Sequence, residues 1–162
     1  MSGRPSVLVR EARLGDYDAL VALFHELDEF HRQARPDVFR SFQGPARTYE
    51  QVERWLAGPG STVLVAEHEG DVVGLAVLLQ RPPPGFAGAI PHRVVELDNL
   101  VVRADRRGQG VGRLLLEAML AWSRKQAASH ISVSVHAFNR DARRFYEGFG
   151  FVPSINRLVL RA

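Results

Sequence analysis

The feature that most constrains the fold of this chain is a strand-like apolar run that leads into a glycine-rich turn and then into a long amphipathic run. The apolar run is Val94–Val102, the turn contains Gly108, Gly110 and Gly112, and the amphipathic run is Val111–Lys125. Glycines let a backbone turn sharply and approach a ligand closely. The N-terminus of a helix offers unpaired N–H groups and the positive end of the helix dipole. A strand, a glycine-rich turn and a helix in this order therefore predict a phosphate-binding loop.

Two common nucleotide-binding loops are excluded by the same residues. A P-loop requires Lys-Ser or Lys-Thr after its second glycine, and the only lysine of the chain is Lys125. A dinucleotide-binding loop reads G-x-G-x-x-G and is followed by an acid roughly 20 residues later. Here the glycines are spaced G-x-G-x-G, and the positions around Ser132 hold Ser and Val. Arg106, Arg107 and Arg113 surround the turn and are suited to a pyrophosphate.

Two motifs give the chain its resemblance to a known family. Residues 107–112, Arg-Gly-Gln-Gly-Val-Gly, match the pattern Gln/Arg-x-x-Gly-x-Gly/Ala, which is the acetyl-CoA signature of the GNAT superfamily of N-acetyltransferases. Residues 97–102 resemble the strand that precedes this signature. Asn139, Ala142, Phe145-Tyr146-Glu147 and Gly150-Phe151 resemble the second family motif, N…A…FYE..GF. The chain resembles the superfamily over nearly its whole length, which implies one domain, 1–162, with acetyl-CoA as cosubstrate.

The resemblance also implies which residues bind the cofactor. Backbone groups of Leu100, Val101 and Val102 would pair with the pantetheine arm as with an added strand, and one N–H group freed by a bulge would polarise the thioester carbonyl. Asn139 and Arg143 would contact the cofactor from the start of the next helix. The pyrophosphate would be held by the loop residues Arg107, Gly108, Gln109, Gly110, Val111, Gly112 and Arg113.

Three residues are candidates for catalysis. Tyr146 lies seven residues after Asn139, on the same helical face, and the resemblance makes its hydroxyl group the proton donor to the departing sulfur. The acceptor amine must lose a proton before it attacks. Glu96 and Asp98 are two apart in a strand, which places both carboxylates on one face about 7 Å apart. Either could accept the proton directly or through water, and the sequence does not separate them.

Composition excludes several other classes of function. The 21 basic residues are Lys125 and 20 arginines, and the formal net charge is +3. The arginines are scattered along the chain, so no nucleic-acid partner is expected. The chain has no cysteine, which excludes disulfides and thiolate chemistry. His25 and His31 are six apart and fall on different helical faces, and no metal site is expected.

The order of predicted elements defines an α/β (α+β) fold. Strands are expected at 6–11, 62–67, 72–79, 93–102 and 130–136, with one or two closing strands in 150–160. Helices are expected from an Asp16 cap onward, at 48–57, 110–125 and 139–147, with a short helical turn at 36–42. The resemblance implies a mixed, mostly antiparallel sheet of six to seven strands in which parallel strands 4 and 5 splay apart, flanked by about four helices. The last strand would lie at an accessible edge, so a homodimer is expected. No apolar run approaches ~18 residues, so we expect a cytoplasmic protein without a membrane partner.

The predicted function is transfer of an acetyl group from acetyl-CoA to a primary amine of a small molecule or peptide, by direct attack in a ternary complex. The alternative is a catalytically quiet acyl-CoA-binding sensor or scaffold, against which Tyr146 and the nearby acids argue. A tRNA-directed acetyltransferase would need a coherent basic face, which the scattered arginines do not predict.

Overall fold

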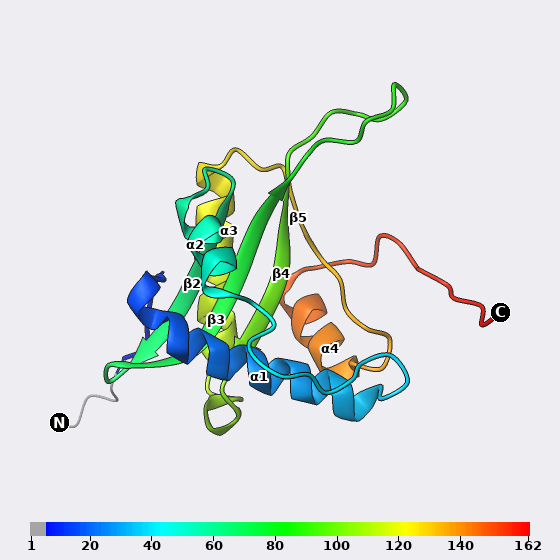
Figure 1. Ribbon diagram of the computed structural model, residues 1–162. Coiled ribbons are helices and arrows are strands. Elements are labelled where there is room, and N and C mark those ends of the chain that lie inside the picture. Colours follow the sequence, from blue (N-terminus) through cyan, green and yellow to red (C-terminus); the bar gives the residue numbers. More distant parts are fainter. Residues whose placement is uncertain (1–5) are drawn as a thin grey trace.

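The computed structural model of the chain describes residues 6–162 and contains one five-stranded sheet flanked by helices (Figure 1). The sheet has the strand order β1-β2-β3-β4-β5, and its neighbours are antiparallel except for the parallel pair β4 and β5. The mixed, mostly antiparallel sheet with parallel strands 4 and 5 is confirmed. The strands are β1 (Leu8–Glu11), β2 (Ser61–His68), β3 (Asp71–Arg81), β4 (Val94–Val102) and β5 (His130–Val133), and the helices are α1 (Tyr17–Ala34), α2 (Tyr49–Ala57), α3 (Val111–Lys125) and α4 (Arg140–Phe149).

Both faces of the sheet are buried because its central strands are apolar on both sides. In β2, Val63 and Val65 face α1 and α2, while Leu64 and Ala66 face α3. The helices α1 and α2 therefore cover one face and α3 covers the other, as Figure 1 shows. Buried apolar area is the main source of stability in such a layered fold.

Local sequence signals define most of the element boundaries. The β2–β3 hairpin turns on Glu69 and Gly70, both at positive φ, which is typical of the two-residue turn that matches strand twist. His68 pairs directly with Asp71, so each strand runs one residue further into the turn than the predicted ranges 62–67 and 72–79. Thr48 caps α2 by accepting a hydrogen bond from the Gln51 backbone N–H (3.2 Å).

Asp16 is the N-cap residue of α1, as predicted, but its side chain makes no capping hydrogen bond. A short 3₁₀ turn, η1 (Leu14–Asp16), precedes the helix, and Asp16 already has helical backbone angles. Its carboxylate accepts hydrogen bonds from the Arg13 backbone N–H (2.7 Å) and from the Arg10 guanidinium (2.8 Å) instead. The residue therefore ties the start of α1 to β1.

Three other boundaries differ from the sequence prediction. The closing strands predicted in 150–160 are wrong, because within the described residues this segment has no strand partner, and its apolar side chains from Val152 onward are exposed. A strand needs a paired edge as well as alternation. The helical turn predicted at 36–42 is reduced to a single turn, in which the Val38 and Phe39 N–H groups both donate to the Arg35 backbone oxygen (3.0 and 2.9 Å). β5 ends at Val133 rather than at 136.

A bulge in β4 decides how its side chains face. Val77 of β3 pairs with Asn99 and the next residue, Leu78, pairs with Leu97, so Asp98 is an extra residue without a partner in β3. Before the bulge Leu97 packs toward α3, and after it Val101 packs toward α1. The regular alternation assumed through β4 therefore does not hold, and the bulge presents Asp98 at the middle of the strand.

Candidate active site

The site begins where β4 and β5 separate. Their pairing runs from Val94 with His130 to Leu97 with Val133 and then stops, while β4 continues to Val102. The predicted splay is present. A cavity of about 550 Å³ lies at this point and is bordered by β4, α1, α4 and the connections before α2 and α4. Five of the predicted site residues line it, namely Glu96, Asp98, Leu100, Asn139 and Tyr146.

The two candidate acids have different environments in the cavity. Glu96 accepts a hydrogen bond from Arg81 Nε at 2.6 Å, whereas Asp98 lies 4.0 Å from Arg81 Nη2 and accepts a hydrogen bond from the Asn99 amide. Burial raises the pKa of Asp98, and the charge of Glu96 raises it further. A carboxylate with a raised pKa is a better proton acceptor than one neutralised by an arginine.

A second arginine organises the wall contributed by α1. Arg47 donates to both carboxylate oxygens of Asp28 (2.5 and 2.6 Å) and to the Asn99 side-chain oxygen (3.0 Å). Its guanidinium carbon also lies 4.6 Å from the centroid of the Phe24 ring. No local sequence pattern indicates Arg47 and Asn99 as site residues, because their contact joins positions 52 apart in the chain.

Tyr146 is buried at the base of the cavity, packed against Phe145 and Phe151 with ring centroids 5.4 and 5.6 Å away. Burial raises the pKa of Tyr146 to about 12. Its hydroxyl group therefore stays protonated at neutral pH. A protonated hydroxyl group that borders a cavity can donate a proton to a group in that cavity.

Asn139 is the N-cap of α4, as its sequence position indicates. Its side-chain oxygen accepts a hydrogen bond from the Ala142 backbone N–H at 3.1 Å, which leaves the amide N–H₂ group available to the cavity that the residue lines. Arg143 is exposed and paired with Glu147 (2.8 Å). The structure therefore does not bring Arg143 to the cavity with Asn139 and Tyr146.

The glycine-rich turn lies at the N-terminus of α3 and has the conformation that the sequence predicted for close approach. Gly108 and Gly110 have φ angles of +71° and +86°, and a Cβ atom at either would meet only open space. The first intrahelical bond runs from the Leu114 N–H to the Gly110 oxygen, which leaves the N–H groups of Val111, Gly112 and Arg113 unpaired within the helix. Open space above unpaired N–H groups fits a pyrophosphate.

At Gly112 the absence of a side chain is required by helix packing rather than by a positive φ angle. A Cβ atom there would lie 3.0 Å from Cζ of Phe145, so the missing side chain lets α3 and α4 approach closely. The contact links the helix that begins at the glycine-rich turn to the helix that carries Tyr146.

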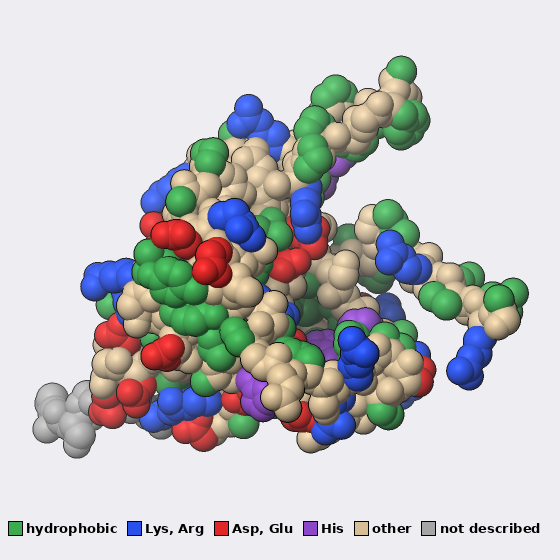
Figure 2. Space-filling view, in the orientation of Figure 1, with side chains coloured by type: hydrophobic (Ala, Val, Ile, Leu, Met, Phe, Trp, Pro, Cys, Tyr) green, Lys and Arg blue, Asp and Glu red, His purple; other side chains and the backbone are tan. Residues whose placement is uncertain are grey.

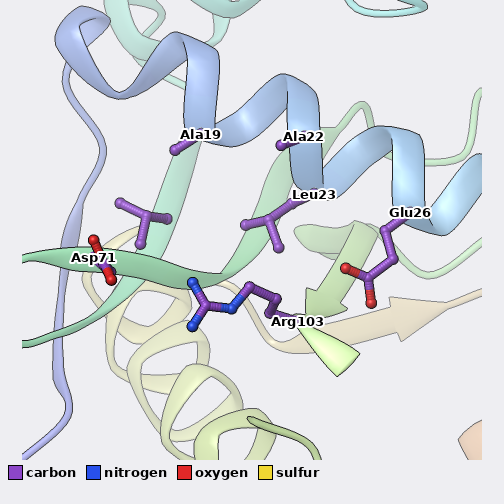
Figure 3. A pocket seen from close by; sticks show the side chains of 7 residues that line it. Ala19, Ala22, Leu23, Glu26, Asp71 and Arg103 are labelled. Atoms are coloured by element: carbon purple, nitrogen blue, oxygen red, sulfur yellow. The ribbon is translucent and has the colours of Figure 1, made fainter. Parts of the chain in front are cut away.

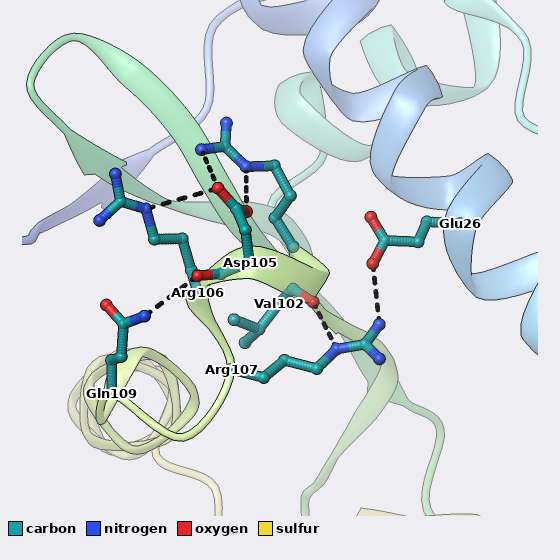
Figure 4. A network of polar contacts seen from close by, with 7 residues as sticks. Glu26, Val102, Asp105, Arg106, Arg107 and Gln109 are labelled. Carbon is teal, nitrogen blue, oxygen red and sulfur yellow. Dashed lines mark hydrogen bonds and ion pairs between the residues drawn. The ribbon is translucent and has the colours of Figure 1, made fainter.

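The side chains of the turn brace it rather than point into open space (Figure 4). Arg107 donates to the Val102 backbone oxygen (3.0 Å) and to Glu26 of α1 (2.9 Å). Gln109 donates to the Asp105 backbone oxygen at 3.0 Å, and Arg113 pairs with Glu117. Contacts within the protein therefore hold the turn at the end of β4.

A smaller hollow of about 250 Å³ lies between α1 and the start of β3. Figure 3 shows Ala19 and Ala22 above it and Asp71, Arg103 and Glu26 around it. None of the catalytic candidates lines this hollow, so the larger cavity is the candidate active site.

Aromatic rings form the outer wall of the cavity. His31 of α1, Phe39 and His136 lie with their ring centroids 5.2 to 5.4 Å apart, and all three line the cavity. Within residues 6–162 no group of three or more His, Cys, Asp or Glu side chains is placed to hold a metal ion. In the same part of the chain, no helix combines the length and the apolar character that crossing a membrane requires.

Comparisons with known proteins agree with this geometry. The sequence profile of the Acetyltransferase (GNAT) family matches residues 21–151. The chain is 29% identical over 143 residues to the uncharacterized N-acetyltransferase YhfO of Bacillus subtilis (strain 168), which covers 88% of each chain.

Among solved structures, the tetramutant of the BH1408 protein from Bacillus halodurans superposes with a TM-score of 0.89 at 28% identity, covering 96% of this chain and 99% of that chain. The aminoglycoside N-acetyltransferase AAC(6')-Iy in complex with CoA has a TM-score of 0.75 at 16% identity, covering 100% of this chain and 98% of that chain. The second similarity is one of fold.

Proposed function

Because the chain belongs to the GNAT acetyltransferase family, we propose that it transfers an acetyl group from acetyl-CoA to a primary amine within a ternary complex. The observation that carries this proposal is the joint presence of Asp98, Asn139 and Tyr146 around one cavity where β4 and β5 separate. The relatives named as N-acetyltransferases support the same reaction class.

The proposed binding of acetyl-CoA uses backbone groups for most of its length. The unpaired N–H groups at the start of α3 and the open space above Gly108 and Gly110 suit the pyrophosphate. The part of β4 beyond Leu97 has no partner in β5, so its backbone suits the amide groups of pantetheine. The cosubstrate supplies a thioester, whose carbonyl carbon is open to attack by an amine.

Two side chains are proposed to move protons. The Asp98 carboxylate accepts the proton of the acceptor ammonium group, directly or through water. The amine nitrogen then forms the new bond to the acetyl carbon and loses its second proton to solvent as the carbon–sulfur bond breaks, while Tyr146 Oη donates a proton to the leaving sulfur and is afterwards reprotonated from solvent. The hydrogen bond that Glu96 accepts from Arg81 favours Asp98 over Glu96 as the base, which the sequence alone left open.

Release of coenzyme A from acetyl-CoA in the presence of a panel of primary amines tests this proposal. Acetylated amine should appear in the same amount as free thiol. Thermal stabilisation by acetyl-CoA without release of thiol by any amine would instead support the sensor or scaffold.

A further inference from the structure

The outer part of the cavity has a specific chemical character. Its wall consists of His31, Phe39, Phe42 and His136, which come from α1 and the connections before α2 and α4. His31 Nδ1 lies 2.9 Å from the Leu27 backbone oxygen, and this contact requires a proton on Nδ1. The rings of His31, Phe39 and His136 are in contact with one another, and the parts of their surfaces that line the cavity are flat and apolar.

Two of the three carboxylates on the wall are paired with arginines, and Arg40 adds a positive charge to the cavity lining. Asp28 is held by Arg47 and Glu96 by Arg81. Desolvation lowers the pKa of His136, and so do the charges of His31 and Arg35; the ring of His136 is therefore neutral at pH 7. The remaining cavity-lining carboxylate is Asp98, and it lies at the β4 side.

We infer that the acceptor is a primary amine whose carbon skeleton carries an aromatic ring. The ammonium group would approach Asp98 and the ring would lie against Phe39 and His136. This inference rests on the proposed acetyl transfer. A phenylethylamine and the N-terminal amine of a peptide that begins with an aromatic residue share this chemistry.

Initial rates with 2-phenylethylamine, phenylalaninamide and n-butylamine test the inference. We expect kcat/KM to be about tenfold or more higher for the aromatic amines than for n-butylamine, which is the size of effect that a stacked ring gives. Phenylalaninamide represents the peptide source and phenylethylamine the small-molecule source. Equal kcat/KM values for all three amines would overturn the inference and leave the acetyl transfer intact.

A variant pair assigns the effect to the wall. Phe39→Leu should raise KM for phenylethylamine by a larger factor than KM for n-butylamine, while the matched change Phe86→Leu, in the exposed β3–β4 connection, should alter neither. If no amine is acetylated, the proposed function fails. Calorimetric binding of phenylethylamine and n-butylamine to the protein with coenzyme A then decides the acceptor inference, and equal affinities would reject it.

A separate observation concerns the C-terminal segment, residues 152–160. Its large apolar side chains are between 81% and 93% exposed, and they are Val152, Ile155, Leu158, Val159 and Leu160. Figures 1 and 2 show the segment leaving α4 and standing away from the body of the molecule. So many exposed large apolar side chains in one short segment are rare on a monomer and are typical of an interface.

The sheet has an open edge that suits this segment. Within residues 6–162, β5 is the last strand and pairs only with β4, so its outer N–H and C=O groups have no strand partner there. Ile131 and Val133 of β5 are half-buried, and a further strand at this edge would bury them more.

The start of the segment directs it away from its own sheet. The Phe151 backbone N–H donates to the Tyr146 backbone oxygen (3.0 Å), and the ring centroids of Phe151 and Tyr146 lie 5.6 Å apart. Pro153 follows after one residue and restricts the backbone. We propose that residues 154–160 add as a strand to β5 of a second copy of this chain, and that the exchange is reciprocal, which closes a twofold dimer.

Light scattering and cross-linking test this exchange. The full chain should be a dimer, and Leu158→Asp should be a monomer with unchanged helix content, while Ile90→Asp, at an exposed apolar site outside the segment, should remain a dimer. A monomeric full chain, or a dimer that survives Leu158→Asp, would overturn the proposal.

The absence of cysteine allows the two partners to be labelled separately. One preparation carries Ser132→Cys in β5 and the other carries Ser154→Cys at the start of the segment. After the two are mixed and allowed to exchange, a bifunctional maleimide should yield a covalent dimer that contains both. Cross-linking within a single chain that carries both cysteines, without covalent dimers, would show that the segment folds back on its own sheet and would reject the exchange.

Discussion

Burial raises the pKa of both the proton donor and the proton acceptor of the proposed reaction, with different consequences for the two. Tyr146 is made a weaker acid by burial, with its pKa raised to about 12, so it remains protonated over the whole pH range in which an enzyme of this kind is assayed. Asp98 is also shifted upward from its ordinary value of 3.8, by burial and by Glu96. The pH dependence of turnover should therefore come from the titration of Asp98 and of the acceptor amine rather than from Tyr146.

Tyr146→Phe tests the donor. The change keeps the ring and its packing on Phe145 and Phe151, so stability should change little. If Oη protonates the leaving sulfur, kcat should fall roughly 10²–10⁴-fold, the usual contribution of a positioned acid, while the affinity for acetyl-CoA stays near that of the wild type. A decrease in kcat of less than about threefold would leave Tyr146 with a packing role alone.

Asp98→Asn and Glu96→Gln separate the two acids. Asp98→Asn should lower kcat/KM by roughly 10²–10⁴-fold. Glu96→Gln removes a like charge that raises the pKa of Asp98 and releases Arg81, so the pKa of Asp98 should fall. A base acts above its pKa, and the acidic limb of the kcat/KM profile should therefore move to lower pH with activity retained. The opposite ranking of the two variants would make Glu96 the base.

At the scale of elements, the same substitution can be compared at Gly110 of the glycine-rich turn and at Gly70 of the β2–β3 turn. Gly110 and Gly70 have φ angles of +86° and +85°, and a Cβ atom at either would meet open space, so the backbone strain of an aspartate is the same at both. Gly110→Asp adds a negative charge where the pyrophosphate is proposed to bind, and stabilisation by acetyl-CoA in a thermal-shift titration should be lost. Gly70→Asp, in the β2–β3 turn, should retain it. Equal ligand responses in the two variants would remove the turn from the cofactor site.

Elements whose signals lie within a few residues could be predicted from the sequence. The amphipathic spacing of α1 and α3, the Glu69-Gly70 turn and the Asn139 cap each depend on neighbours close in the chain. The bulge at Asp98, the Arg47 contact with Asn99 and the ring wall of His31, Phe39 and His136 depend on residues far apart in sequence. No periodicity encodes such contacts. The prediction of closing strands in 150–160 was wrong for the same reason, because a strand forms only where the edge of another strand pairs with it.

At the scale of the whole molecule, one cation connects three early elements. Arg10 of β1 donates to Asp16 of η1 (2.8 Å) and to Glu67 of β2 (2.8 Å), and its side chain is only 21% exposed. The hydrogen bond from Arg10 lowers the pKa of Asp16 below 3.8. A carboxylate whose folded pKa is depressed contributes stability above its unfolded pKa and loses it as the pH falls through the folded pKa.

Arg10→Met tests this connection. At pH 7 the variant should be less stable by about 2 kcal/mol, the typical value of charge-assisted hydrogen bonds. As the pH falls below 3.8, the ordinary pKa of the group, the difference from the wild type should shrink, because the wild type loses this stabilisation as the pH approaches and passes the lowered folded pKa of Asp16. Chemical denaturation at pH 7 and pH 3 measures it. Arg35→Met removes an exposed pair with Asp37 and should change stability little at either pH; an equal loss in both variants would contradict the connecting role of Arg10.

The bulge in β4 implies that the pairing between β3 and β4 would persist if Asp98 were deleted. The pairing of Val77 with Asn99 and of Leu78 with Leu97 is the register of a regular strand from which Asp98 has been omitted. A chain lacking Asp98 would keep Leu97 and Leu100 toward α3 and Val101 toward α1, as they are now. Its core would remain intact and it should fold with nearly the same melting temperature, but without the proposed base. The proposed base Asp98 is therefore an inserted residue of β4, and the β3–β4 pairing does not require it.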